Sequence, residues 1–263
     1  MKYIIGATTG DIVGSIYEFD NIKKLDFPLF SDDCCVTDDS IMTFATMDVL
    51  LNKGDYTDIY QRYGRNYPDP EYVGYGGNFG EWIYSTNPQP YNSWGNGSAM
   101  RVSPIGWAYD TLEQTIIEAK NSAIVTHNHP EGIKDAQATA SAIFLARIGK
   151  TKNEIKNYIT DTFKYNLDRK IDEIRTIYDF DVSCQGSVPE AIIAFLESVD
   201  YEIALRLAIS IGGDSDTIAC ITGGIAEVSY RQVPDSIVER VFEILPKEFS
   251  FLPKEFSFKY LKQ

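Results

Sequence analysis

The chain has 263 residues, with 24 Lys and Arg against 38 Asp and Glu, and its formal net charge is −14 at pH 7. Hydrophobic residues make up 44% and charged residues 24%, which is ordinary for a globular protein and excludes a disordered or fibrous chain. The acidity excludes nucleic acid and anionic membrane surfaces as general partners, because phosphate-rich polymers require a basic protein face. A phosphate-bearing substrate would therefore need to be held by something other than a field of Lys and Arg.

The spacing of the cysteines and the length of the apolar segments indicate the cellular compartment. Cys34 and Cys35 are adjacent, Cys184 and Cys220 stand alone, and no pair has the CxxC spacing. This usage is typical of reduced thiols and gives no cysteine-based zinc site. No segment approaches the roughly 18 apolar residues of a membrane span, and the N-terminal segment lacks the apolar stretch of a signal peptide. We therefore expect a cytoplasmic protein without membrane contact.

Helical periodicity dominates the chain. Residues 41–51 are apolar almost all round, which predicts a central helix that is buried on most sides. In later segments apolar residues recur at spacings of three and four, which predicts helices over residues 131–149, 188–196, 218–228 and 238–245. Because period-two runs are scarce, we expect an all-α fold. No shift in composition divides the chain, so we expect one domain, residues 1–263.

Two segments do not follow this pattern. Residues 67–97 are rich in glycine, proline and aromatic side chains, which favours an ordered loop that packs or stacks on something. At the other end of the chain, the seven residues LPKEFSF occur at 245–251 and again at 252–258. Two such copies are too few and too short for a solenoid. The simplest interpretation is a duplication in a tolerant tail, residues 245–263.

Two short acidic segments each precede an apolar helix: residues 37–40, TDDS, and residues 212–217, GGDSDT. Helix capping is one interpretation, because Asp, Ser and Thr are preferred at helix N-termini and acids there suit the helix dipole. The alternative is a metal site, because paired carboxylates beside Thr hydroxyls are hard oxygen donors suited to Mg²⁺, Mn²⁺ or Ca²⁺. Spacing alone leaves both interpretations open, since it does not show that the two segments meet.

Six motifs, taken in chain order, resemble those of the ADP-ribosylglycohydrolase family. They are GDIVGSIYEF at 10–19, TDDS at 37–40, GNGSAMR at 95–101, THNHP at 126–130, CQGSVPEA at 184–191 and GGDSDTI at 212–218. Each motif is short, but all six occur in the family's order and span most of the chain. The resemblance implies a single compact orthogonal bundle of many helices with a binuclear metal centre.

The same resemblance implies a set of metal ligands and a reaction. The ligands would be Thr37, Asp38, Asp39, Asp214, Asp216 and Thr217, and they would hold two Mg²⁺, with Mn²⁺ as an alternative. The family hydrolyses the bond between the terminal ribose of ADP-ribose and an acceptor. Known acceptors include arginine and serine side chains and small conjugates such as acetylated ADP-ribose. We therefore expect an ADP-ribose-containing substrate, including an ADP-ribosylated protein, and a monomeric enzyme.

Roles follow by motif position. Asp38 and Asp39 would align metal and water, and Glu18 would be a general acid/base or a gate; an exposed helix carboxylate is the plainer interpretation of Glu18. His127 would approach the phosphates and ribose, and Gly76 would lie in a loop close to the ribose. The diphosphate would meet amide dipoles in a glycine-rich turn formed by Ser93, Trp94, Gly95, Asn96 and Gly97.

Other interpretations of these residues remain open. The glycine-rich turn is also consistent with a simple tight turn. Phe79, Tyr91 and Trp94 suit stacking on adenine or packing within the loop. His129, the second of the two histidines, receives no role, and a zinc site at this pair is disfavoured because no third soft ligand is nearby.

Two further functions compete with the ADP-ribosyl hydrolase. The first is a catalytically idle ADP-ribose-binding or structural protein of the same fold. The second is an enzyme that acts on a different N- or O-glycoside. The intact set of acids favours an enzyme over the idle protein, and the presence of the glycine-rich turn favours a phosphate-bearing substrate over a simple glycoside.

Overall fold

The computed structural model describes residues 3–68 and 74–261. In these ranges the chain is all-α and forms no strand, and Gly95 and Ser183 pair in an isolated β-bridge. The all-α prediction is therefore confirmed. Residues 69–73 of the predicted loop and the outermost residues of the predicted domain and tail lie outside the described residues.

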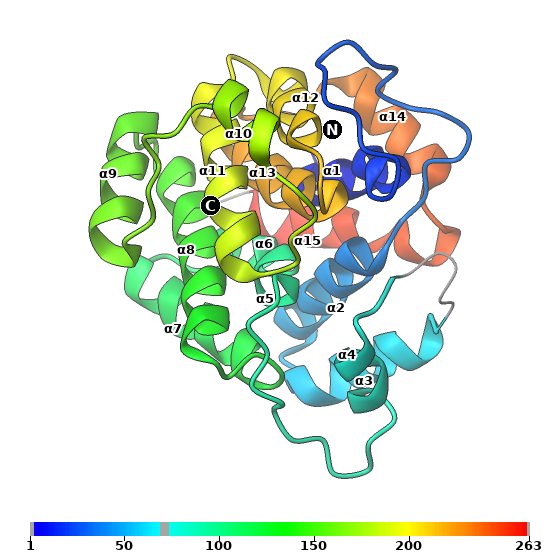
Figure 1. Cartoon of the computed structure of the whole chain (residues 1–263). Coiled ribbons are helices and arrows are strands. Elements are labelled where there is room, and N and C mark those ends of the chain that lie inside the picture. Colours follow the sequence, from blue (N-terminus) through cyan, green and yellow to red (C-terminus); the bar gives the residue numbers. More distant parts are fainter. Residues whose placement is uncertain (1–2, 69–73, 262–263) are drawn as a thin grey trace.

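The helices surround a central group formed by α1, α2 and α13 (Figure 1). Their bounds are α1 Gly6–Gly14, α2 Asp38–Asn52, α3 Tyr56–Asn66, α4 Gly77–Trp82, α5 Gly97–Met100, α6 Ser103–Ala108, α7 Leu112–Ile124, α8 Pro130–Arg147, α9 Lys152–Phe163, α10 Ile171–Ile177, α11 Cys184–Glu197, α12 Tyr201–Ile211, α13 Ser215–Tyr230, α14 Asp235–Ile244 and α15 Leu252–Tyr260. Two 3₁₀ helices, η1 and η2, cover Ser15–Tyr17 and Lys247–Phe249. The five helices predicted from periodicity correspond to α2, α8, α11, α13 and α14.

Helix α1 packs on α13, and glycine residues of α1 allow the two helices to approach closely. Gly6, Gly10 and Gly14 recur every fourth residue and therefore lie on one face of α1. A Cβ added to Gly10 would overlap the backbone carbonyl of Ala219 on α13, and one added to Gly14 would overlap Asp216. The bare face thus allows backbone contact and places the end of α1 beside the start of α13.

Helix α2 is the central helix that the sequence predicts. Apolar side chains on all of its sides, among them Ile41, Phe44 and Met47, are buried. Thr37 caps the helix, because its hydroxyl accepts the backbone N–H of Asp39 at 3.3 Å. The buried body of α2 therefore holds its acidic N-terminus at a fixed place in the interior.

The aromatic loop contains a short helix, α4, which the sequence does not predict. Phe79 and Trp82 of α4 are buried and stacked, with ring centroids 5.5 Å apart. The Gln61 side-chain amide on α3 donates to the carbonyl oxygen of Trp82 at 2.9 Å. In its described part the segment thus packs on α3.

The two LPKEFSF copies adopt different structures. The first follows α14 and forms η2, and its Phe249 is stacked on Phe44 of α2, with ring centroids 4.8 Å apart. The second forms α15, with Phe256 fully buried. Its Ser257 hydroxyl accepts the backbone N–H of Ile4 at 2.7 Å. Both copies thus supply a phenylalanine to the core, so the described part of the tail belongs to the packed fold. Its origin by duplication stays a prediction.

All four cysteines are free thiols in the structure. In residues 3–68 and 74–261, no helix combines the length and the apolar character that a membrane crossing requires.

Candidate metal centre

The two acidic segments meet in the folded chain. At the start of α13, the Thr217 hydroxyl donates to the Asp39 carboxylate of α2 at 3.1 Å. The Thr37 hydroxyl lies 3.3 Å from the Asp216 carboxylate. The contact that sequence spacing left open therefore exists, and it lies where the N-termini of α2 and α13 converge.

Among the described residues, the acids form two overlapping groups in which one carboxylate oxygen per residue lies within 4.8 Å of the others. The groups are Asp11, Asp39 and Asp216, and Glu18, Asp214 and Asp216. Asp216 belongs to both, which suits two neighbouring ions that share a ligand. Asp38 belongs to neither group but lines the same pocket.

The chemistry of these groups fits divalent cations. Asp39 is 1% exposed, and its Oδ1 atom is buried without a hydrogen-bond partner. Burial, and then repulsion by the neighbouring acids, raises the pKa values of Asp38 and Asp39 well above 3.8. Buried carboxylate and hydroxyl oxygens are the donors that Mg²⁺, Mn²⁺ and Ca²⁺ prefer. A bound cation would satisfy the orphaned oxygen and remove the repulsion.

Asp11 on α1 is a buried acid of this centre that the sequence analysis assigned no role. Its carboxylate accepts the Thr37 hydroxyl at 2.6 Å and the backbone N–H groups of Thr37 and Ser40 at 3.1 Å each. It therefore fixes the start of α2 from outside that helix. The available signal was its position in the GDIVG motif, whose glycines bring α1 against α13.

Asn96 is in direct contact with the acids of the candidate metal centre. Its side-chain amide donates to the Asp214 carboxylate at 2.6 Å and to the Ser187 hydroxyl at 2.8 Å. The structure thus shows Asn96 as a partner of a predicted metal ligand. Its predicted contact with the substrate stays a prediction.

A pocket of about 280 Å³ opens over the acids. Its lining includes these predicted site residues: Glu18, Asp38, Asp39, Gly76, Ser93, Gly95, Asn96, Gly97, His127, Asp214, Asp216 and Thr217. Thr37 lies behind the lining, and Trp94 is 54% exposed beside the pocket. Phe79 and Tyr91 also line it. One cavity therefore joins the acids to the glycine-rich turn.

Glu18 follows η1 and is half-buried at the edge of the acids. Burial, followed by repulsion from Asp216 and Asp11, raises the pKa of Glu18 to about 8. The interpretation as an exposed helix carboxylate does not hold. In the metal-free protein this side chain carries a proton at neutral pH.

His127 also lines the pocket, and its imidazole is neutral. Its burial, and then the nearby Arg101 guanidinium, lower the pKa of His127 well below 6.5. Its Nδ1 atom lies 2.7 Å from the Thr126 hydroxyl. Arg101, which also lines the pocket, is 1% exposed and donates to the Thr126 hydroxyl at 2.9 Å. His129 has a structural role as the N-cap of α8.

The glycine-rich turn already uses two of its N–H groups. The Gly95 N–H donates to the Ser93 hydroxyl at 3.2 Å, and the Asn96 N–H donates to the carbonyl oxygen of Val182 at 2.9 Å. Gly97 begins α5 and packs against the His127 ring. The polar groups at this end of the pocket therefore centre on Gly97, His127 and the buried Arg101.

A family model described as ADP-ribosylglycohydrolase matches residues 1–254. The chain belongs to the ADP-ribosylglycohydrolase family. Mouse ADP-ribosylhydrolase ARH3 (Mus musculus) is 26% identical over 312 residues, which cover 89% of this chain and 84% of that protein. Human ADP-ribosylhydrolase ARH3 (Homo sapiens) is 28% identical, with 89% of this chain and 86% of that protein covered.

More distant relatives agree with this membership. Putative ADP-ribosyl glycohydrolase L543 of Acanthamoeba polyphaga mimivirus is 25% identical, over 90% of this chain and 89% of that protein. A solved structure described as an ADP-ribosylglycohydrolase-related protein complex superposes with a TM-score of 0.74 at 22% identity. It covers 96% of this chain and 94% of its own, and it shows that the ADP-ribosylglycohydrolase fold is the fold of this chain.

Proposed function

We propose that the protein is a metal-dependent hydrolase that cleaves the glycosidic bond at ribosyl C1″ between ADP-ribose and an acceptor, and so reverses ADP-ribosylation. The acceptor would be an arginine or serine side chain or a small conjugate. The observation that carries the proposal is the convergence of Asp39, Asp216 and the two Thr hydroxyls at one end of a pocket. Family membership supports an ADP-ribose-containing substrate.

Thr37, Asp38, Asp39, Asp214, Asp216 and Thr217 would hold two Mg²⁺ or Mn²⁺ ions. Bound divalent cations supply the positive charge that orients ribose hydroxyls and lowers the pKa of a bound water. The chain itself holds these donors in place. Asp11 accepts the Thr37 hydroxyl at the start of α2, and the Asn96 amide donates to Asp214. Asp38 and Asp39 would align the water toward C1″.

Glu18 would protonate the leaving group. Cleavage at C1″ passes through an oxocarbenium-like state, and a general acid beside the bond assists departure of the acceptor. Burial is the largest cause of the raised pKa of Glu18, and it does not depend on the neighbouring acids, so it favours the protonated form that a general acid requires. Its place at the pocket edge, next to Asp216, is consistent with this role.

The diphosphate would lie at the other end of the pocket, against Gly97 and His127. A neutral imidazole there can donate one hydrogen bond to a phosphate oxygen. The buried Arg101 guanidinium acts electrostatically on His127, and its positive charge would favour a phosphate there. A small anionic ligand can thus enter a protein whose net charge is −14.

The test is release of ADP-ribose from arginine-, serine- and acetyl-linked conjugates, each with Mg²⁺ and with EDTA. We expect Mg²⁺-dependent release from at least one conjugate and none in EDTA. Absence of release from every conjugate, with ADP-ribose still bound, would instead identify an idle ADP-ribose-binding protein.

A further inference from the structure

The turn between α12 and α13 has an unusual backbone conformation, which contacts from other segments hold in place. Gly212 and Gly213 have φ angles of +79° and +69°, in the left-handed region that favours glycine. Asp214 follows directly and Asp216 lies in the first turn of α13. The shape of this turn therefore determines where both acids lie.

One side chain holds this turn to the segment that carries Glu18. The Asn21 Oδ1 atom accepts the Gly213 N–H at 2.7 Å. The Asn21 Nδ2 group lies within donor distance of three backbone oxygens: those of Tyr17 at 2.7 Å, Glu18 at 2.9 Å and Gly213 at 3.0 Å. Although Asn21 lies at the surface, its amide thus contacts both pieces of the centre.

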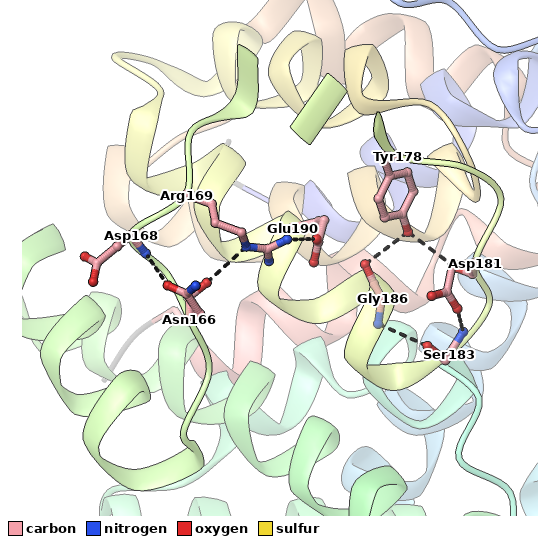
Figure 2. A network of polar contacts seen from close by, with 8 residues as sticks. All are labelled: Asn166, Asp168, Arg169, Tyr178, Asp181, Ser183, Gly186 and Glu190. Atoms are coloured by element: carbon pink, nitrogen blue, oxygen red, sulfur yellow. Dashed lines mark hydrogen bonds and ion pairs between the residues drawn. The ribbon is translucent and has the colours of Figure 1, made fainter. Parts of the chain in front are cut away.

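Neighbouring contacts hold the same turn from two other directions. The Lys23 ammonium donates to the carbonyl oxygens of Ile211 at 2.6 Å and Tyr178 at 2.7 Å. The Tyr178 ring lies against Gly213, where an added Cβ would overlap it. The Tyr178 hydroxyl in turn donates to the Gly186 carbonyl oxygen of α11 at 3.0 Å (Figure 2). Of these contacts, only the Asn21 amide bonds to the backbone of Glu18.

We propose that Asn21 is a positioning residue, which fixes Glu18 relative to Asp214 and Asp216 and thereby sets both the affinity for divalent cations and the rate of glycosidic cleavage. Asn21 does not line the pocket, so its effect must pass through the residues it holds. The part of this proposal that concerns rate rests on the proposed function. The part that concerns cation affinity rests on the geometry alone.

The test begins without substrate. Mn²⁺ is titrated calorimetrically into the wild type, Asn21→Ala and Asn21→Gln. Because groups that orient ligands typically change metal affinity 10- to 100-fold, we expect Asn21→Ala to bind Mn²⁺ about 10-fold more weakly. Asn21→Gln keeps the amide on a longer stem, so its loss should be smaller. Mn²⁺ affinities of both variants within about twofold of the wild type would overturn the proposal.

Kinetics on the conjugate that the wild type cleaves give the second measurement. At saturating Mn²⁺ we expect kcat of Asn21→Ala to fall about 10-fold with KM changed less than about threefold, because the displaced Glu18 acts on the reacting bond. An unchanged kcat overturns the claim about rate. If the wild type cleaves no conjugate, the proposed function fails, and the Mn²⁺ titration still decides the role of Asn21. A wild type that binds no Mn²⁺ overturns both.

Lys152→Met is the matched control for general destabilisation. The Lys152 ammonium donates to the carbonyl oxygen of Phe195 at 2.7 Å, to that of Ser198 at 2.5 Å and to the Tyr230 hydroxyl at 2.8 Å, far from the acids. Its loss also removes several hydrogen bonds, but from another helix end. We expect a lower melting temperature with Mn²⁺ affinity and kcat unchanged. Equal losses of Mn²⁺ affinity in Lys152→Met and Asn21→Ala would show that Asn21 acts only through stability, and would overturn the proposal.

Discussion

The two acidic helix starts have similar compositions and different local structures. At α2, Thr37 is a regular N-cap whose hydroxyl accepts the Asp39 N–H, and Asp11 reinforces it from α1. At α13, Asp214 is the N-cap residue and makes no capping hydrogen bond; its carboxylate accepts from Asn96 instead. Thr37 therefore caps the first start, while Asp214 at the second start is held by Asn96, from elsewhere in the chain.

The two helix starts therefore contribute differently to folding stability and to metal binding. A side chain that caps its own helix contributes to folding whether or not a ligand is present. A buried carboxylate that does not cap its helix, among other acids, costs folding free energy until a cation neutralises it. We therefore expect substitutions of the acids at the α13 start to change metal binding most, and substitutions of the α2 cap to cost more stability than substitutions of those acids.

Asp216→Asn should show the largest effect. Asp216 belongs to both acid groups, so the amide would remove a shared ligand. Loss of several kcal/mol of transition-state stabilisation corresponds to turnover about 10³-fold lower. The metal-free variant should nevertheless melt higher than the metal-free wild type, because one buried charge is gone. Turnover is measured with Mg²⁺ and melting with EDTA; a variant that keeps Mg²⁺-dependent turnover contradicts the account.

Gly213→Ala should have the next largest effect. The substitution imposes a left-handed φ on alanine and drives its Cβ into the Tyr178 ring, at a cost of about 2–3 kcal/mol. Gly149→Ala is the matched control, because Gly149 also has a positive φ, +83°, but an added Cβ meets nothing within 4 Å. It should cost only about 1 kcal/mol. Urea unfolding of both variants gives the difference, and equal costs would exclude the crowding at Tyr178.

Thr37→Val addresses the other helix start. The isosteric change removes the cap of α2 and leaves the buried Asp11 carboxylate without the Thr37 hydroxyl, at a cost of about 2 kcal/mol. Asp214→Asn, which removes no cap and keeps an acceptor oxygen, should cost less than about 1 kcal/mol. Thr37→Ser should retain most of the stability. The comparison is made by urea unfolding in EDTA, and it fails if Asp214→Asn is the more costly substitution.

The smallest expected effect is on pH dependence. The raised pKa values of Asp38, Asp39 and Asp216 stabilise the metal-free fold fully below the unfolded-state value near 3.8. That contribution is lost as pH rises through the folded-state pKa values. We therefore expect the melting temperature in EDTA to fall between pH 5 and pH 8, and the increase caused by Mg²⁺ to be larger at pH 8 by several degrees.

Asp135 provides the control for that experiment. Burial raises its pKa to about 7, and both carboxylate oxygens are buried without a hydrogen-bond partner. Asp135→Asn should flatten part of the fall between pH 5 and pH 8 and leave the effect of Mg²⁺ unchanged. An effect of Mg²⁺ that is independent of pH in the wild type would mean that the acids do not bind the cation.

The sequence predicted five of the longer helices, for a physical reason. Helices α2, α8, α11, α13 and α14 have strong apolar periodicity, and periodicity is local information. Short elements such as α4 and α5 depend on contacts with distant segments, which no local pattern contains. The two LPKEFSF copies show the same limit, since identical residues form η2 in one place and α15 in the next.

The same distinction between local and remote information applies to the site residues. Paired carboxylates and motif positions suggested Asp38, Asp39, Asp214 and Asp216 as ligands, while the hydroxyl of Thr37 fits either a cap or a ligand. The roles of Asp11, Asn21 and Arg101 were missed, because each acts through a partner that is remote in sequence. Asp11 bonds to α2, Asn21 to the α12–α13 turn and Arg101 to Thr126.

We propose that the starts of α2 and α13 form one site for divalent cations. Calorimetric titration of Mn²⁺ into the metal-free wild type, Asp39→Asn and Asp216→Asn at pH 8 tests it most directly. We expect about two ions per wild-type chain and a loss of Mn²⁺ binding from both variants, although the substituted residues lie on different helices. Retained binding in either variant, or no binding by the wild type, would contradict it.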